Sequence, residues 1–289
     1  MKRPPEINIG ATRIVFLTDG FWRNDGGCMF GVVPRELWKK NHPPDVYNRI
    51  RLNLTCPLIL RGREAILVDT GIGNRLSATE RKIFDHGEGW LLDGLQALGM
   101  EPGDITAVIL SHLHFDHCGG IVRHRESGVI ETAFPCARIF VQQGELEIAK
   151  GPKNERLRTA YRHLEECLAP NIKAIEPMDG ELEIISGVTA RVTGGHTRDH
   201  QVVVVRDGDG SFAHLADIVP TRSHLSGAWN QAYDLDPMAT MEHKAAYLRQ
   251  AVSERSWIGF AHDDHLFAAQ IVHQDGKTKI GHSIGAIAE

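Results

Sequence analysis

Residues 105–120 of this 289-residue chain read ITAVILSHLHFDHCGG. The first six residues, 105–110, are mostly apolar and β-branched, which predicts a buried strand. The next segment carries four side chains that could bind a metal ion within six residues, namely His112, His114, Asp116 and His117. Imidazole and carboxylate groups suit zinc and similar divalent ions.

The spacing of these four side chains predicts how they would be used. In an extended segment, residues two apart point the same way, so His112 and His114 can grip one ion. If the chain then turns into a helix, Asp116 and His117 project in a different direction and could hold a second ion nearby. Ionisable groups packed this closely at the end of an apolar strand need a metal or a charge network to offset desolvation. We therefore interpret the segment as a metal centre rather than a solvated loop.

Further candidate ligands follow other apolar strands. His196 follows the predicted strand 189–193, Asp217 ends the apolar run 212–216, and His262 closes the strand 257–261. Catalytic groups of α/β proteins gather at the carboxyl ends of strands. We expect these three residues to join the first four, with Asp217 able to bridge two ions.

The rest of the chain alternates short apolar runs with helical patterns, which predicts an α/β architecture with helices outside the sheets. Besides those above, the expected strands are 12–17, 56–60, 65–69, 107–111, 138–142 and 201–206, and the expected helices are 89–98, 143–149, 154–168 and 237–253. Asp207-Gly208-Asp209-Gly210 predicts a hairpin turn. Residues 20–53 lack periodicity, so we expect a long irregular loop that covers a site. We interpret residues 1–289 as a single domain.

Composition limits the kinds of partner and the cellular compartment that we expect. The net charge of −5 gives no reason to expect nucleic acid or an anionic membrane as a partner. Five cysteines without a Cys-x-x-Cys pair argue against a disulfide framework or a zinc knuckle, and we interpret Cys118 as a small buried residue. The N-terminal region lacks the apolar stretch of a signal peptide, and no window approaches a membrane span. These features predict a cytoplasmic protein.

The His-x-His-x-Asp-His segment, followed in order by His196, Asp217 and His262, resembles the ligand set of the metallo-β-lactamase superfamily. The resemblance extends from Asp69-Thr70-Gly71 to His262. It implies an αββα sandwich of two mixed β-sheets flanked by helices, with a dinuclear site in the cleft between the sheet edges. By that match the first ion would be bound by His112, His114 and His196. The second would be bound by Asp116, His117 and His262, with Asp217 bridging.

Three other segments are similar to quorum-quenching lactonases of this superfamily, which open N-acyl homoserine lactones and have methyl parathion hydrolases among their relatives. These segments are 25–34 (DGGCMFGVVP), 216–221 (ADIVPT) and 233–237 (YDLDP). Two departures flank the ligands: Thr197-Arg198-Asp199-His200 stands where such lactonases often read Thr-Pro-Gly-His, and Ala216-Asp217 stands where Gly-Asp is usual. The ligands themselves are unchanged.

The resemblance predicts a dinuclear hydrolase. Two divalent ions, zinc in the first place and iron, manganese or cobalt as alternatives, can lower the pKa of a shared water toward ~7 and so supply hydroxide. Asp116 and Asp217 would be the catalytic carboxylates, with Asp116 shuttling the proton to the leaving group. Asp69 is a candidate partner that orients a ligand histidine through its other ring nitrogen.

We expect a small-molecule substrate with an apolar group. The early aromatic and sulfur side chains suit an acyl chain, while two later residues could donate hydrogen bonds to a carbonyl. The predicted contacts are Phe21, Trp22, Met29, Phe30, His224 and Tyr233. The apolar segment from Trp22 to Trp38 could also pack on a second copy of the chain, which makes a homodimer a hypothesis.

Several alternatives remain open at this stage. A phosphotriesterase, a thioester hydrolase or a β-lactamase would keep the fold and change the substrate. The acidic balance argues against a nuclease of the same fold. A non-catalytic metal-binding or redox module, as in flavodiiron proteins, is the non-enzyme alternative; these resemble His-x-Glu-x-Asp-His, whereas this chain has His114. A metal titration with a turnover assay separates binding from catalysis.

Overall fold

A computed structural model describes residues 3–87, 89–149 and 158–285. These residues form two seven-stranded sheets and one small two-stranded sheet. The first sheet has the order β1-β2-β3-β4-β5-β8-β9, with bounds Glu6–Ile9, Thr12–Asp25, Arg49–Arg61, Glu64–Val68, Ala107–Ile109, Arg138–Gln142 and Ile175–Met178. The second has the order β10 to β16, with bounds Leu182–Ile185, Val188–Val192, Gln201–Asp207, Gly210–His214, Trp257–Gly259, Leu266–Gln274 and Lys277–Gly285. The small sheet pairs β6 (Val122–His124) with β7 (Ile130–Thr132).

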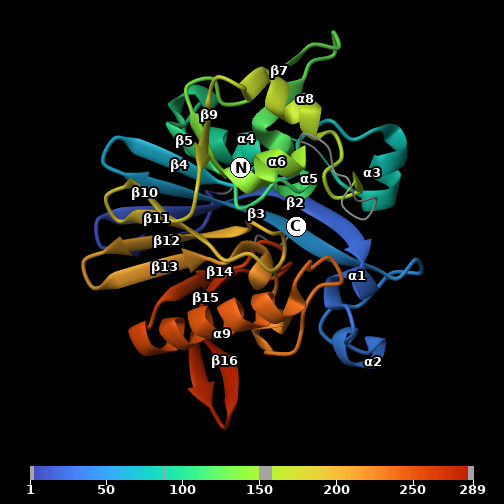
Figure 1. Cartoon of the computed structure of the whole chain (residues 1–289), viewed down its shortest axis with the longest axis vertical. Helices are drawn as coiled ribbons and strands as arrows, with labels where there is room; N and C mark the ends of the chain where they lie inside the picture. The colour runs from blue at the N-terminus through green and yellow to red at the C-terminus, as the bar shows by residue number, and fades with distance from the viewer. Residues whose placement is uncertain (1–2, 88, 150–157, 286–289) are drawn as a thin grey trace.

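Helices flank the two large sheets on their outer faces (Figure 1). On the side of the first sheet lie α3 (Ala78–Phe84), α4 (Trp90–Ala97), α5 (Phe115–Cys118), α6 (Gln143–Ala149) and α8 (Leu164–Leu168). The long helix α9 (Pro237–Glu254) covers the second sheet, and α1 (Gly26–Phe30) and α2 (Arg35–Trp38) lie at one end. This arrangement confirms the predicted αββα class.

Strand β12 shows why the sheets stack as they do. Its apolar run contributes Val203 and Val205 to the core between the sheets and Val202 and Val204 to the core beneath α9. Because successive side chains of a strand point to opposite faces, an uninterrupted apolar run fits only a strand that is buried on both faces. The turn that follows pairs Asp207 with Gly210 at the start of β13, which confirms the predicted hairpin.

Two adjacent glycines allow the metal-motif segment to approach the chain after β4. A Cβ atom on Gly119 would lie 2.2 Å from the carbonyl oxygen of Ile72, and one on Gly120 would lie 2.2 Å from that of Thr70. Any side chain there would push the two segments apart. The amide of Thr70 donates to the carbonyl of His117 at 2.7 Å. The segment after β4 is thus held directly against the segment that carries the candidate ligands.

The predicted irregular loop 20–53 is wrong as a description of the backbone. Residues 20–25 continue β2, residues 49–53 begin β3, and the two strands pair from Phe21↔Asn53 to Asp25↔Arg49. The short helices α1 and α2 lie between them. The mixed polar and aromatic side chains hid these strand ends because a register shift between Thr18 and Phe21 interrupts the alternation.

The predicted helix 154–168 is confirmed only at its end. Residues 154–157 lie outside the described residues, 159–163 form turns, and α8 spans Leu164–Leu168. The final hairpin of β15 and β16 was missed, because its polar, mostly exposed second half carries little apolar pattern. The single-domain interpretation stays a prediction.

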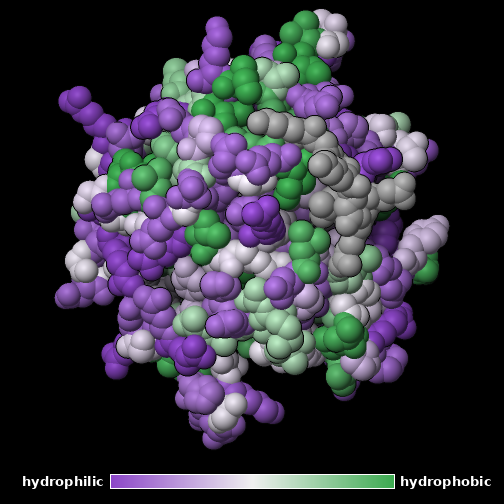
Figure 2. Space-filling model, in the orientation of Figure 1, coloured by the Kyte–Doolittle hydropathy of each residue, from purple (hydrophilic) through white to green (hydrophobic). Residues whose placement is uncertain are grey.

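On the face drawn in Figure 2, the coloured hydrophobic residues are scattered among hydrophilic ones rather than gathered in one broad patch. None of the described helices is long and apolar enough to cross a membrane. The side chains of Trp22, Met29, Phe30 and Trp38 are buried within the chain itself. They are therefore not available to pack on a second copy, and the homodimer stays a hypothesis without them.

Candidate metal centre

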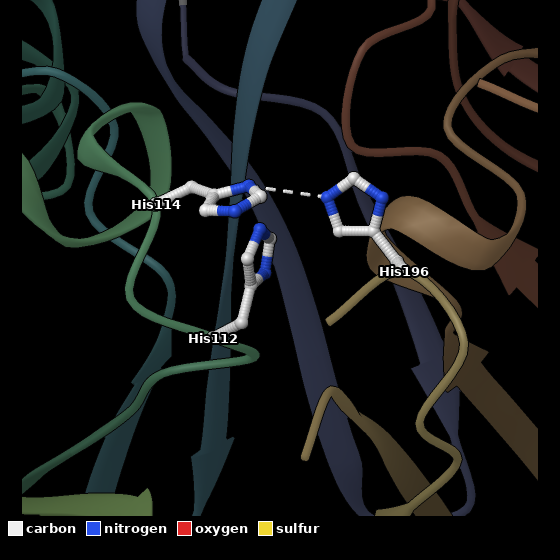
Figure 3. A group of neighbouring side chains, drawn as sticks. All are labelled: His112, His114 and His196. Atoms are coloured by element: carbon white, nitrogen blue, oxygen red, sulfur yellow. Dashed lines mark hydrogen bonds between the residues drawn. The ribbon is translucent and has the colours of Figure 1, made fainter. Parts of the chain in front are cut away.

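Strand ends from both sheets meet at one place. The segment after β5 carries His112, His114 and, on α5, Asp116 and His117. His196 follows β11, Asp217 lies in a short 3-10 helix after β13, and His262 follows β14. In Figure 3, His112 and His114 reach in from one side and His196 from the other, with the three rings turned toward one another.

The ligand atoms of these residues are close enough to share metal ions. Three groups have all their ligand atoms within 4.8 Å of one another: His112, His114 and His196; His112, His117 and Asp217; and Asp116, His117 and His262. The two carboxylate oxygens of Asp217 face opposite halves of the cluster. Its Oδ2 lies 3.2 Å from His196 Nε2, and its Oδ1 lies 3.2 Å from His262 Nε2. The structure therefore brings together all seven residues that the sequence predicted as ligands.

Each of three imidazoles is held from behind by an acceptor. Nδ1 of His117 lies 2.9 Å from Asp69 Oδ2, Nδ1 of His196 lies 2.8 Å from Asp234 Oδ1, and Nδ1 of His262 lies 2.9 Å from the Asn53 carbonyl. In a neutral imidazole only one nitrogen carries the proton, so donation from Nδ1 leaves a lone pair on Nε2. The predicted contact of Asp69 with a ligand histidine is present.

These lone pairs converge on the centre of the site. Nε2 of His262 lies 3.2 Å from Nε2 of His117, and His196 Nε2 lies 3.1 Å from His114 Nδ1 (Figure 3). The buried Nε2 of His112 and Oδ1 of Asp217 have no hydrogen-bond partner among the described residues. Acceptors that face one another this closely need a cation between them. The site therefore fits divalent metal ions.

Burial and charge set the protonation of the cluster. Burial lowers the pKa of His112 and His114 well below the ordinary value, which keeps both rings in the neutral form that binds a metal. Burial alone would raise the pKa of Asp217, but His262, His196 and His117 around it hold that pKa well below its usual range. Burial alone would lower the pKa of His117 and of His196, but the nearby carboxylate of Asp217 raises both. Imidazole nitrogens and a carboxylate are the donor set that divalent zinc accepts once those protons leave.

A pocket opens directly onto the cluster, and the space within it, including the part open to solvent, is about 460 Å³. Five predicted ligands lie at its base, namely His114, Asp116, His196, Asp217 and His262. Its walls include Trp22, Met29 and Tyr233, as the sequence predicted, together with residues that the sequence did not single out: Asn24, Phe84, Phe115, Thr159, Ala160, Arg162 and Gln231.

Three predicted substrate contacts are wrong, because they do not line this pocket. Phe30 is fully buried and stacks on Trp38 and His224. Both ring nitrogens of His224 are engaged, with Thr221 Oγ1 at 2.8 Å and the Met29 carbonyl at 2.9 Å. Phe21 packs edge-on against Trp90, beneath the guanidinium of Arg51. The alternation of β2 sends Trp22 toward the pocket and Phe21 away from it.

Two polar residues that support the ligands were missed. Asp234 fixes His196, and the side-chain amide of Gln231 donates to Asp217 Oδ2 at 3.0 Å. Asp234 was visible only as part of the lactonase-like segment 233–237. Gln231 carries no local signal, because its role depends on a loop that returns to the site from the second sheet.

The two sequence departures beside the ligands leave the cluster intact. His200 accepts the backbone N–H of Asp217 at 3.2 Å, and its Nδ1 lies 2.8 Å from Thr193 Oγ1. Ala216 has a φ of 43°, in the left-handed region that favours glycine. The alanine at this position therefore stores strain next to Asp217. Cys118 is buried, as predicted.

Comparison with known proteins identifies the class. Residues 53–133 match the family model described as the metallo-beta-lactamase superfamily. The structure of a probable metal-dependent hydrolase from Staphylococcus aureus matches with a TM-score of 0.90 and 28% identity, covering 98% of this chain and 100% of that one. Residues 53–133 thus match the metallo-beta-lactamase superfamily, and the fold is similar to that of a probable metal-dependent hydrolase, in agreement with the resemblance seen in the sequence.

Within that class the chain is similar to N-acyl homoserine lactonases. The enzyme of Bacillus cereus is 30% identical over 172 residues, which are 55% of this chain and 60% of that enzyme. The enzyme of Bacillus thuringiensis is 29% identical over 230 residues, or 74% of this chain and 82% of that enzyme. The chain thus spans about three fifths of the length of the first curated relatives that it matches, 60% and 58%.

Proposed function

We propose that this protein is a dinuclear metal-dependent lactonase that opens N-acyl homoserine lactones or related lactone rings. The observation that carries the proposal is the convergence of seven candidate ligand side chains, five of which lie at the base of a largely apolar pocket. The similarity to N-acyl homoserine lactonases supports the choice of substrate.

Two ions, zinc in the first place, would be held in two halves of the cluster. His112, His114 and His196 would bind the first, Asp116, His117 and His262 would bind the second, and Asp217 would bridge them. When bound, the ions would supply Lewis acidity and lower the pKa of water between them toward ~7.

The protein's own groups would bind the substrate and move the proton. Trp22, Met29 and Phe115 give the pocket an apolar wall for an acyl chain. Burial raises the pKa of the Tyr233 phenol, which keeps its proton available for a hydrogen bond to the lactone carbonyl oxygen. Asn24 Nδ2 donates to this hydroxyl oxygen at 3.2 Å and orients it.

Asp116 would carry the proton. Its Oδ2 lies 3.5 Å from His262 Nε2, and the residue lines the pocket. During ring opening the oxygen of water joins the acyl carbon, the ring C–O bond breaks, and a proton must reach the departing alkoxide. Asp116 would take that proton from the water and deliver it to the alkoxide oxygen.

The test is acid release from N-hexanoyl homoserine lactone by protein loaded with zinc or cobalt, with the metal content measured on the same sample. We expect rapid ring opening that falls about 100-fold or more in Asp217→Asn, because the bridging carboxylate is lost. Asp209→Asn is the matched control, since Asp209 is exposed in the β12–β13 turn.

Two outcomes would overturn the proposal in different ways. Two metal ions per chain without acid release above background would keep the hydrolase class and remove this substrate, so phosphotriesters and thioesters would be assayed next. Full activity with Asp217→Asn would remove the bridging role while leaving the substrate assignment in place.

A further inference from the structure

The pocket contains one cation whose place in the reaction is not accounted for. Arg162 is the only lysine or arginine among the described residues that line the pocket. Its side chain is 19% exposed, in a pocket whose other walls are largely apolar. A guanidinium in such a position needs partners that offset its desolvation.

Backbone and ring contacts hold Arg162 against the metal motif. The amide of Phe115 donates to the Ala160 carbonyl at 2.9 Å, which ties the 159–163 turn to α5. The Arg162 guanidinium carbon lies 4.7 Å from the centroid of the Phe115 ring and 5.0 Å from that of Phe84. Such cation–π contacts fix the plane of the guanidinium. Because Phe115 lies between two predicted ligands, the position of Arg162 is set relative to the metal centre.

A carboxylate fixes the same side chain from the other direction. Arg162 Nη1 donates to Glu80 Oε1 at 3.2 Å, and Nε donates to the Thr159 carbonyl at 2.8 Å. Glu80 is itself held by the Ser77 amide at 2.9 Å and the Ser77 hydroxyl at 2.8 Å, as the capping box of α3. Partial burial alone would raise the pKa of Glu80, but hydrogen bonds from Ser77 and His163 lower it to about 2. Glu80 is therefore ionised at neutral pH.

The remaining donors of Arg162 are available to a ligand. Two of its five N–H donors have hydrogen-bond partners among the described residues. Because Glu80 already balances the positive charge of Arg162, a second anion bound to this guanidinium would be repelled by Glu80. A neutral oxygen acceptor matches this arrangement better than a carboxylate or a phosphate does.

We propose that Arg162 determines specificity by donating a hydrogen bond to the amide carbonyl oxygen on the acyl side of the substrate. This inference rests on the proposed lactonase function. An N-acyl homoserine lactone has such an oxygen beside its ring, whereas a simple alkyl lactone lacks it. Arg162 therefore selects amide-bearing lactones over alkyl lactones.

The experiment compares two five-membered lactones, N-hexanoyl homoserine lactone and γ-decalactone, with wild type and two variants. In Arg162→Gln, kcat/KM for the amide substrate falls about 10- to 100-fold, as expected for the loss of a hydrogen bond to a charged group. The loss lies mainly in KM, and the value for γ-decalactone stays within about threefold. Arg162→Lys retains the charge without the planar fork of the guanidinium. Its decrease in kcat/KM is therefore smaller and again affects the amide substrate.

His163→Asn is the matched control. His163 Nε2 shares Glu80 Oε1 with Arg162 at 3.1 Å, yet His163 does not line the pocket. Asparagine also tolerates the left-handed backbone of residue 163, whose φ is 60°. This variant tests loss of a Glu80 partner without loss of the pocket cation, and the substrate ratio should stay unchanged.

The outcomes separate this inference from the proposed function. Wild-type protein that opens neither lactone, with metal bound, overturns both. Wild-type activity on both lactones, with an unchanged substrate ratio in Arg162→Gln and Arg162→Lys, overturns the role of Arg162 alone. If Arg162→Gln does not fold, the ratio measured for Arg162→Lys decides. A wild-type preference for anionic esters that is lost in the variants would also overturn the choice of a neutral acceptor.

Discussion

The protein buries two groups of histidines, and they are built in opposite ways. In the candidate metal centre, the free ring nitrogens of His117, His196 and His262 face inward, toward one another and toward a carboxylate. Around Phe30, the rings of His42 and His224 lie 5.0 and 5.2 Å from the phenyl ring. Nε2 of His42 and both nitrogens of His224 bond outward to hydroxyl or carbonyl groups, whereas Nδ1 of His42 has no partner among the described residues.

The difference shows that burial of histidine does not by itself identify a ligand. Both groups are shielded from water, but only the first directs the nitrogens of several rings at one another and at a carboxylate. The second packs against an aromatic ring, and three of its four ring nitrogens bond to neighbouring hydroxyl or carbonyl groups, which is the commoner use of a buried ring with polar atoms. The direction of the ring nitrogens decides the function, and three experiments can break or sharpen this distinction.

Removal of metal should have the largest effect. Chelation with dipicolinate should abolish hydrolysis and lower the melting temperature by roughly 5–10 °C, because ions bound only by the folded state stabilise it. Added zinc should restore both. Hydrogen exchange then distinguishes the two regions: amides of residues 112–118 should lose protection, while those of 221–225 should keep it. Equal loss in both regions would mean that the two groups are not independent.

Substitution behind the ligands should have an intermediate effect. Asp69→Asn and Asp234→Asn should each weaken metal affinity about 10- to 100-fold, because each carboxylate orients one ligand histidine. Asp69 also accepts the amide of Ser111 at 2.7 Å and its hydroxyl at 2.8 Å. The metal-free form of Asp69→Asn should therefore lose more stability than that of Asp234→Asn, by about 1–3 kcal/mol.

The measurements are competition with a chromophoric chelator and urea unfolding of the metal-free proteins. Asp209→Asn, on the exposed hairpin turn, serves again as the control. Unchanged metal affinity in both variants would contradict the orienting role. Equal stability of the two metal-free variants would contradict the additional structural role of Asp69.

The smallest effect should come from acid titration of the Phe30 group. Burial lowers the pKa of His42 to about 4 and that of His224 to about 3. In the unfolded chain these histidines titrate near ~6.5, so between that pH and about 4 the unfolded state binds more protons. Their contribution to stability is full above ~6.5 and declines as the pH falls, with a slope of up to about 1.4 kcal/mol per pH unit for each.

His224→Phe should reduce the slope of stability against pH by the contribution of one histidine. The measurement is urea unfolding of the metal-free protein from pH 7 to 4.5. The variant also loses stability at pH 7, because the Met29 carbonyl and the Thr221 hydroxyl lose their partner. His273→Gln is the control, since that side chain is exposed on β15. An unchanged slope in His224→Phe would show that His224 is not held neutral by its surroundings.

Local patterns predicted the centre of the site well. The apolar run 105–110 followed by closely spaced histidines indicated a strand that ends in a ligand turn, because ligand spacing and strand alternation are both short-range properties. His196, Asp217 and His262 followed by the same rule, each after an apolar strand. The prediction of a loop at 20–53 was wrong, because an irregular register in β2 removes the alternation by which a strand is recognised.

The pocket wall could not be predicted in the same way. Phe21 and Trp22 are neighbours of similar chemistry, yet only Trp22 lines the pocket, because the strand's twist and pairing decide which face is inward. Phe84, Arg162 and Gln231 come from segments far apart in the chain and meet only after the sheets have stacked. His224 is of a residue type that is common in functional sites, but its contacts are those of a core residue.

The sequence by itself indicated an α/β protein and the seven residues that meet at one site, because both follow from the spacing of apolar and ligating side chains along the chain. Its resemblance to the superfamily implied the sandwich of two sheets. Only the tertiary structure decided which acceptor stands behind each imidazole, which aromatic rings face the pocket, and where Arg162 lies. Those properties depend on the relative placement of elements distant in sequence, and that placement is set by the packing of both sheets together.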